Sequence, residues 1–178
     1  MRVTETHLKG VKIIEPKVFG DHRGFFKETF NKERYEQEVG IKLQFVQDNY
    51  SHSHKGVLRG LHFQKNNPQG KLVSVINGAV YDIAADIDPE SSTYGQYVGI
   101  ELSSDNHRQL WIPPGYAHGF VVLSDKVDFF YKCTSYYDPL DEDGISWNCS
   151  LLSIDWPIKS IQLSEKDKKY TGLGVKDV

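Results

Sequence analysis

An Asn-Gly pair between two apolar runs is the feature that most constrains the fold of this chain. Asn77-Gly78 separates the runs 71–76 and 79–87, which are rich in valine, isoleucine and alanine. Asn and Gly most readily accept the positive φ angles that a two-residue hairpin turn requires. The pair therefore predicts an antiparallel hairpin in the middle of the chain.

Short β-prone runs recur along most of the sequence, separated by clusters of Gly, Pro, Asn, Asp or Ser. They lie near residues 11–19, 43–46, 57–63, 72–76, 79–87, 97–102, 109–112, 119–123 and 127–133. About nine short strands are typical of an all-β jelly-roll sandwich or barrel. The 178 residues contain no internal repeat or linker, so we expect residues 1–178 to form a single domain.

Helical patterns are scarce. Residues 31–39 (NKERYEQEV) read as one short helix with Asn31 as its N-cap. A further helical turn is expected after Ser164, where Ser-Glu-Lys-Asp resembles a capping box.

Composition narrows the range of functions. The 21 basic and 24 acidic residues give a net charge of -3 with no long basic run, which argues against nucleic-acid binding. The polar start, residues 1–10, lacks the apolar core of a signal peptide, and no apolar run is long enough for a membrane span. Cys133 and Cys149 are the only cysteines and form no disulfide framework. We therefore expect a cytoplasmic protein.

The segment 51–64 (SHSHKGVLRGLHFQ) mixes strand formers with polar groups. Alternation along an extended strand would place His62 on one face with Leu58, Gly60 and Gln64, and Arg59 on the other. His62 is then either a hydrogen-bonded core histidine or a general base, because imidazole titrates near neutral pH. The local sequence leaves both open.

Histidines elsewhere raise the question of a metal. The turn Pro113-Pro114-Gly115 delivers His118 to the start of a strand, and His52-x-His54 has the spacing of a ligand pair. A metal site needs several converging ligands. Because His52 and His54 lie among polar residues in an expected turn, we interpret them as solvated and expect no metal.

Aromatic and basic residues supply the remaining candidates. Tyr131, in the aromatic run 129–137, is either a core tyrosine or a proton donor, and Tyr136 or Tyr137 could stack on a flat ring. Arg59 and Lys71 flank inward-facing strands, where an unpaired charge is costly, so each needs an anionic partner from protein or ligand.

Five long blocks together resemble the dTDP-4-dehydrorhamnose 3,5-epimerase family, a group of cupin-type jelly rolls. The blocks are FGDHRGFFKETF at 19–30, FVQDNYSHSHKGVLRGLHFQ at 45–64, QGKLVSVINGAVYD at 69–82, RQLWIPPGYAHGFVVLS at 108–124 and FYKCTSYYDPLDEDGISW at 130–147. The resemblance extends from about residue 10 to residue 167.

The resemblance implies a role for each matching residue. His62 matches the base, Tyr131 the acid, and Asp167 the carboxylate that orients the histidine, while Lys71 lies near the C4 oxygen of the sugar. The other implied contacts with a dTDP-sugar are Gln47, Asp48, Asn49, Arg59, His118, Glu142 and Lys166, with Tyr137 stacking on thymine and Arg23 and Glu28 reaching across a homodimer. Such chemistry requires no cofactor.

The resemblance also implies a dimer in which N-terminal strands are exchanged, and the apolar run Val11-Lys-Ile-Ile14 would suit that exchange. Two departures from the family pattern are visible. Asp88 stands where many members have a basic residue, and Gln64 stands where a metal-dependent cupin would need a second ligand.

The expected reaction is epimerisation at C3 and C5 of dTDP-4-dehydro-6-deoxy-D-glucose in dTDP-L-rhamnose biosynthesis. Three alternatives remain open at this point. They are an epimerase that inverts only C3 or only C5, a metal-dependent cupin oxygenase, and a non-catalytic sugar-binding jelly roll.

Overall fold

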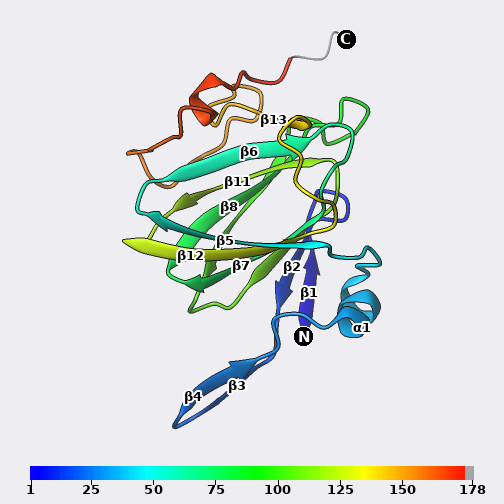
Figure 1. Cartoon of the computed structure of the whole chain (residues 1–178), viewed down its shortest axis with the longest axis vertical. Coiled ribbons are helices and arrows are strands. Elements are labelled where there is room, and N and C mark those ends of the chain that lie inside the picture. Colours follow the sequence, from blue (N-terminus) through cyan, green and yellow to red (C-terminus); the bar gives the residue numbers. More distant parts are fainter. Residues whose placement is uncertain (175–178) are drawn as a thin grey trace.

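The computed structural model describes residues 1–174, and within them the chain forms two antiparallel sheets that face each other (Figure 1). The larger sheet has the strand order β1 (Arg2–Glu5), β2 (Lys12–Glu15), β10 (Gln109–Ile112), β7 (Lys71–Asn77), β12 (Lys126–Cys133) and β5 (Gln47–His54). The smaller sheet has the order β13 (Glu142–Gly144), β6 (Leu58–Gln64), β11 (Tyr116–Val122), β8 (Ala79–Asp86) and β9 (Tyr97–Ser103). The predicted all-β fold is confirmed.

The core lies between the two sheets. The larger sheet contributes Val73, Val75 and Phe129, and the smaller sheet contributes Val80 and Phe120, all of them buried. The rings of Phe120 and Phe129 stack across the gap with centroids 4.2 Å apart. Each such side chain contributes about 1.5–3 kcal/mol through burial, so this seam holds the sheets together.

The predicted hairpin at Asn77-Gly78 is wrong in its pairing, although the turn exists. β7 and β8 belong to different sheets, and both edges of β7 are occupied by β10 and β12. Gly78 has φ of +84°, and a Cβ there would collide with the Lys126 carbonyl oxygen. The turn therefore carries the chain from one sheet to the other, where β8 pairs with β9 and β11.

The strand expected at 43–46 forms four residues later, as the polar strand β5. Its eight residues pair with β12, and alternate side chains face inward, so pairing rather than apolar content defines it. His52 and His54 were expected in a turn, but they lie in this strand. Both are exposed on its outer face, and His52 Nδ1 lies 2.7 Å from Asp128 Oδ1.

The predicted helix at 31–39 is confirmed as a short composite of α1 (Lys32–Arg34) and a π-helical turn (Tyr35–Val39). The Asn31 side chain caps it by accepting a 3.0 Å hydrogen bond from the Arg34 amide. Tyr35 and Val39 are buried beside the larger sheet. A second helical turn, a 3₁₀ helix at Asp167–Lys169, follows Ser164 as expected.

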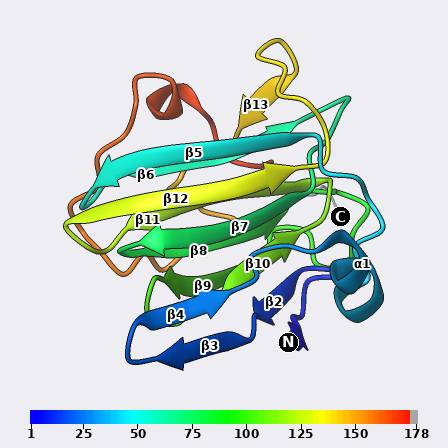
Figure 2. The same ribbon diagram turned by 60° about the horizontal axis from the view of Figure 1, so that its bottom comes forward.

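The hairpin of β3 (Val18–Asp21) and β4 (Gly24–Lys27) projects away from the two sheets (Figure 1). Its aromatic side chains are largely exposed: Phe19 by 52%, Phe25 by 60% and Phe26 by 69%. Figure 2 shows β2 beside this hairpin, close to β10. Within its own chain β2, which contains most of the run at Val11–Ile14, pairs with both β1 and β10.

No helix within residues 1–174 is long and apolar enough to cross a membrane.

Candidate active site

A cavity of about 760 Å³ opens between the two sheets, a size typical of small-molecule sites. Its walls come from β5, β6, β7, β11, β12 and β13, together with the segment around residue 165. Most of the predicted site residues line it: Gln47, Asn49, Arg59, His62, Lys71, His118, Tyr131, Tyr137, Glu142, Lys166 and Asp167. Residues from across the sequence therefore meet at one place.

His62 and Asp167 form a close pair in the wall of this cavity. His62 Nε2 lies 2.7 Å from Asp167 Oδ1, and Asp167 is buried. Burial alone would raise the pKa of Asp167, but the hydrogen bond and charge of His62, with a hydrogen bond from Ser164, outweigh it and lower the pKa below its usual range. An ionised carboxylate accepts from Nε2–H, which leaves Nδ1 of the imidazole as the basic nitrogen.

Asp167 is held in place by a segment that we call the C-terminal strap, residues 162–173. At its start Gln162 exchanges backbone hydrogen bonds with β6 and the turn before it, at 2.8 Å to Gly56 and 2.9 Å from Leu58. Near its end the Ser146 amide donates to the Thr171 carbonyl at 2.9 Å. The strap thus spans the edge of the smaller sheet and is anchored on both sides.

A bulge in β6 places Arg59 and His62 on the same cavity. His62 faces His118 and Arg59 faces Phe120 across β6 and β11, so three residue steps on β6 match two on β11. A strand without this irregularity would have placed the two side chains on opposite faces, which was the expectation from sequence. Arg59 Nε donates to Ser53 Oγ at 3.0 Å.

Two glycines make the bulge possible. Gly60 has φ of +125°, a region that side chains rarely adopt, and a Cβ there would lie 2.5 Å from Gly119 Cα. The backbones of β6 and β11 approach each other where neither strand carries a side chain.

Tyr131 lies on β12 and reaches the cavity from the larger sheet, the opposite side from His62. Burial raises its pKa to about 12, helped by the nearby Cys133. The phenol therefore keeps its proton at neutral pH.

Lys71 begins β7 opposite Cys133 and is only 8% exposed. No residue within 1–174 forms a hydrogen bond or ion pair with its ammonium group. Burial lowers the pKa of Lys71, and the neighbouring Cys133, Glu142 and Asp82 oppose this only in part. A buried cation without a fixed anion is suited to stabilise negative charge on a ligand.

Asp82 is a residue that the sequence reasoning missed. It is fully buried, and its Oδ1 lies 3.0 Å from His118 Nε2, while its Oδ2 has no hydrogen-bond partner within the described residues. Burial raises the pKa of Asp82 and lowers that of His118. The sequence did contain a signal for Asp82, because a carboxylate in the middle of the apolar run 79–87 requires a partner.

Glu142 connects the mouth of the cavity to the histidine. Its Oε2 accepts hydrogen bonds from the Tyr137 hydroxyl at 2.8 Å and from Lys166 Nζ at 2.7 Å. Its Oε1 lies 4.0 Å from His62 Nδ1. Burial opposes ionisation, but the Lys166 and Tyr137 hydrogen bonds outweigh it and lower the pKa of Glu142.

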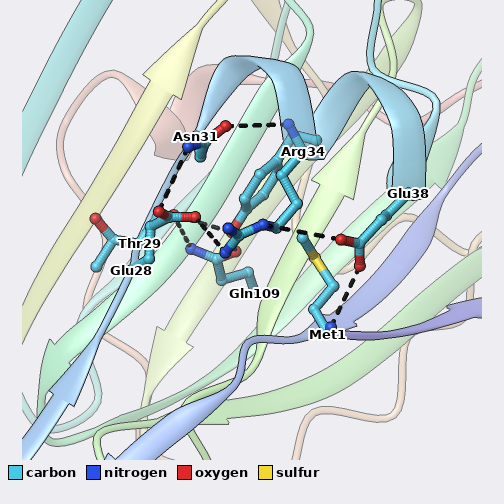
Figure 3. Close-up of polar contacts among 8 residues, drawn as sticks. Met1, Glu28, Thr29, Asn31, Arg34, Glu38 and Gln109 are labelled. Carbon is cyan, nitrogen blue, oxygen red and sulfur yellow. Dashed lines mark hydrogen bonds and ion pairs between the residues drawn. The ribbon is translucent and has the colours of Figure 1, made fainter.

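Three predicted residues lie outside this cavity. Asp48 points to the outer face of β5, because neighbouring residues on a strand alternate, and it pairs with Lys132 at 2.7 Å. Arg23 lies at the tip of the β3–β4 hairpin and pairs with Asp21. Glu28 follows that hairpin and turns towards Arg34 and Asn31, at 2.8 and 3.4 Å (Figure 3).

The side-chain amide of Gln64 forms hydrogen bonds with three backbone groups. Its amide nitrogen donates to the carbonyls of Asn67 and Tyr136, and its oxygen accepts from the Asp138 amide. Within residues 1–174 there is no group of three His, Cys, Asp or Glu side chains placed to hold a metal ion.

Taken together, the cavity walls present the oriented imidazole of His62, the phenol of Tyr131 and the buried ammonium group of Lys71. This combination suits proton transfer beside a carbonyl.

Comparisons with known proteins find similar sequences and structures over nearly the whole chain. The family described as dTDP-4-dehydrorhamnose 3,5-epimerase matches residues 5–174. The dTDP-4-dehydrorhamnose 3,5-epimerase of Salmonella typhimurium is 54% identical over 169 residues, covering 94% of this chain and 92% of the relative. A dTDP-4-dehydrorhamnose 3-epimerase of Streptomyces niveus is more distant, at 35% identity over 94% of this chain and 82% of its own length.

A solved structure from Legionella pneumophila is similar to this chain in both sequence and fold. It is a dTDP-6-deoxy-D-glucose-3,5-epimerase in complex with dTDP-4-keto-L-rhamnose, and it superposes with a TM-score of 0.94 at 53% identity. The match covers 96% of this chain and 92% of that one.

Proposed function

This chain belongs to the dTDP-4-dehydrorhamnose 3,5-epimerase family, and we propose that it works by proton transfer between His62 and Tyr131 across a sugar ring. It is an isomerase that epimerises C3 and C5 of dTDP-4-dehydro-6-deoxy-D-glucose to give dTDP-4-dehydro-L-rhamnose. The fold is the cupin-type jelly roll of that family.

The His62–Asp167 pair is the observation that carries the mechanism. A carbonyl at C4 acidifies the hydrogens on C3 and C5, because the carbanion formed on proton loss is an enolate. Nδ1 of His62 removes the proton, since Nε2 is engaged by Asp167 at 2.7 Å. Asp167 fixes the tautomer and stabilises the imidazolium that forms, as the carboxylate of a catalytic triad does.

Lys71 stabilises the enolate. Its ammonium group lines the same cavity, is almost fully buried, and has no protein anion paired with it in the described part of the chain. A preorganised cation in a site of low dielectric is worth several kcal/mol to a developing oxyanion, about a hundredfold or more in rate.

Tyr131 then delivers a proton to the opposite face of the ring. Its pKa of about 12 keeps the phenol protonated, and it approaches from the larger sheet while His62 approaches from the smaller. Each inversion breaks one C–H bond at His62 and forms another at Tyr131. Solvent then restores the proton to the phenol and removes it from the imidazole before the second carbon reacts.

Substrate binding falls to the polar residues around this centre. Arg59 supplies charge-assisted hydrogen bonds to the diphosphate, and Tyr137, at the cavity mouth, stacks on thymine. The other cavity contacts are Gln47, Asn49, His118, Glu142 and Lys166. No cofactor is needed for this chemistry.

The active form is a homodimer built through the β3–β4 hairpin. Three exposed phenylalanines on this projecting element provide an apolar surface that a second copy would cover. Arg23 and Glu28 lie on or directly after the hairpin, outside their own cavity, which is where residues that complete a partner's site would lie.

Two unpaired buried cysteines support a reducing, cytoplasmic setting.

The proposed reaction is tested by incubating enzyme and substrate in D2O. Two deuterons, one at C3 and one at C5 of the product, are expected. One deuteron would instead identify an enzyme that inverts a single carbon, the activity named for the Streptomyces niveus relative.

A further inference from the structure

A tyrosine outside the cavity wall packs against the proposed base. The rings of Tyr170 and His62 have centroids 5.8 Å apart and an interplanar angle of 68°, an edge-to-face contact of a kind that aromatic pairs favour. Tyr170 is not among the residues that line the cavity. It therefore contacts the imidazole without forming part of the surface that the substrate meets.

The contact depends on a missing side chain. β13 pairs with β6 so that Gly144 lies directly opposite His62. A Cβ on Gly144 would lie 2.6 Å from two ring carbons of Tyr170, closer than real Cβ contacts come. Since φ of Gly144 is outside the left-handed region, the glycine is required for space and not for its backbone conformation. The Tyr170 ring fills the volume that a cross-strand side chain would otherwise occupy.

Tyr170 and Asp167 come from the same strap. Asp167 begins the 3₁₀ turn Asp167–Lys169, and Tyr170 is the next residue. One strap therefore holds the imidazole at two points, by a hydrogen bond to Nε2 and by a ring contact. A hydrogen bond alone leaves the imidazole free to swing about that bond, and the ring contact limits this motion.

The ring and not the hydroxyl of Tyr170 makes this contact. No residue within 1–174 forms a hydrogen bond with the hydroxyl group. Burial is the main reason that the pKa of Tyr170 rises to about 12, so the phenol stays neutral at physiological pH.

We propose that Tyr170 is a positioning residue for His62, and that Gly144 lacks a side chain so that the tyrosine ring can reach the imidazole. The inference rests on the proposed role of His62 as base. Nδ1 must reach both C3 and C5 of one bound ring, so small errors in its direction reduce the productive fraction of encounters. Because Tyr170 does not line the cavity, its loss should lower kcat and leave KM nearly unchanged.

Steady-state kinetics on four variants test this, with circular dichroism and dTDP affinity as checks on folding and binding. Tyr170→Phe should keep kcat within about twofold, whereas Tyr170→Ala and Gly144→Ala should each lower it about tenfold or more, with KM changed less than about threefold. Adding Gly144→Ala to Tyr170→Ala should cost little further, because the new methyl group then meets no ring.

Three results would overturn the proposal: Tyr170→Ala with unchanged kcat, Tyr170→Phe as impaired as Tyr170→Ala, or a rise in KM without a fall in kcat. If Tyr170→Ala fails to fold, Tyr170→Leu keeps the bulk and should show a fall in kcat intermediate between the Phe and Ala variants; equality with Tyr170→Phe would count against a ring contact. His62→Ala is measured alongside. If that variant stays active, the assignment of the base is wrong whatever Tyr170 does.

Discussion

His62 and Asp167 are 105 positions apart in the sequence, yet Nε2 of the histidine lies 2.7 Å from Oδ1 of the aspartate. The imidazole comes from β6 and the carboxylate from the C-terminal strap, which is anchored by backbone hydrogen bonds at both ends. The direction of the base thus depends on a segment that belongs to neither sheet.

Replacing the Asp167 carboxylate should disable His62 as a base while the substrate still binds. In Asp167→Asn the side-chain amide can donate to Nε2, which favours the wrong imidazole tautomer, and we expect kcat to fall about 100- to 10,000-fold with a small change in KM. Asp143→Asn is the matched control, because Asp143 pairs with Lys65 at 2.6 Å and does not line the cavity. An Asp167→Asn enzyme with more than half of the original kcat would refute this role.

The alkaline limb of the pH–rate profile should belong to Lys71 and not to Tyr131. Burial lowers the pKa of Lys71, whereas it raises that of Tyr131 to about 12, so the lysine loses its proton first as pH rises. We expect kcat/KM of the free enzyme to decline below the ordinary pKa of lysine, about 10.4. In Lys71→Arg, whose guanidinium stays charged, the limb should move to higher pH. A limb that Lys71→Arg leaves in place would contradict the assignment.

The β3–β4 hairpin should control assembly. Introducing charge on both faces of the hairpin with Phe25→Asp and Phe26→Asp should convert a dimer into monomers and raise KM, because Arg23 and Glu28 could then not reach a second cavity. Light scattering measures the mass. Leu140→Asp, at a side chain that is 96% exposed elsewhere, is the control and should remain dimeric. A wild-type monomer at micromolar concentration would end the dimer proposal.

The close approach of β6 and β11 should tolerate no added methyl group. A Cβ on Gly119 would lie 2.7 Å from Leu61 Cδ2 and 2.8 Å from the Arg59 carbonyl oxygen. Gly119→Ala should therefore destabilise the protein by about 1–3 kcal/mol, measured by thermal or urea unfolding. Gly174→Ala meets nothing within 4 Å and should be neutral. Equal stability of the two variants would show that the strands separate easily at this point.

Sequence patterns predicted the class of fold well, because apolar runs and turn residues act locally. They failed where a strand's partner decides its structure. Asn77-Gly78 forms its turn but joins two sheets, and the polar strand β5 exists because β12 pairs with it. Alternation misplaced Arg59, since it takes no account of a bulge that two facing glycines allow.

The candidate site, too, was predicted only in part. Resemblance to the family supplied most of the residues that line the cavity, including Asp167, which nothing near His62 in the sequence could have identified. Asp82 and Tyr170 escaped notice because their importance depends on what they touch, His118 in one case and His62 in the other. Contacts between distant segments are what local patterns do not encode.

Deuterium exchange by two single variants tests the central claim most directly. If His62 removes protons from one face and Tyr131 returns them on the other, Tyr131→Phe should exchange the substrate's C3 hydrogen with D2O while forming almost no inverted product. His62→Ala should neither exchange nor invert, although it still binds dTDP. Exchange in His62→Ala at the rate of the unmodified enzyme, or normal inversion by Tyr131→Phe, would contradict the account.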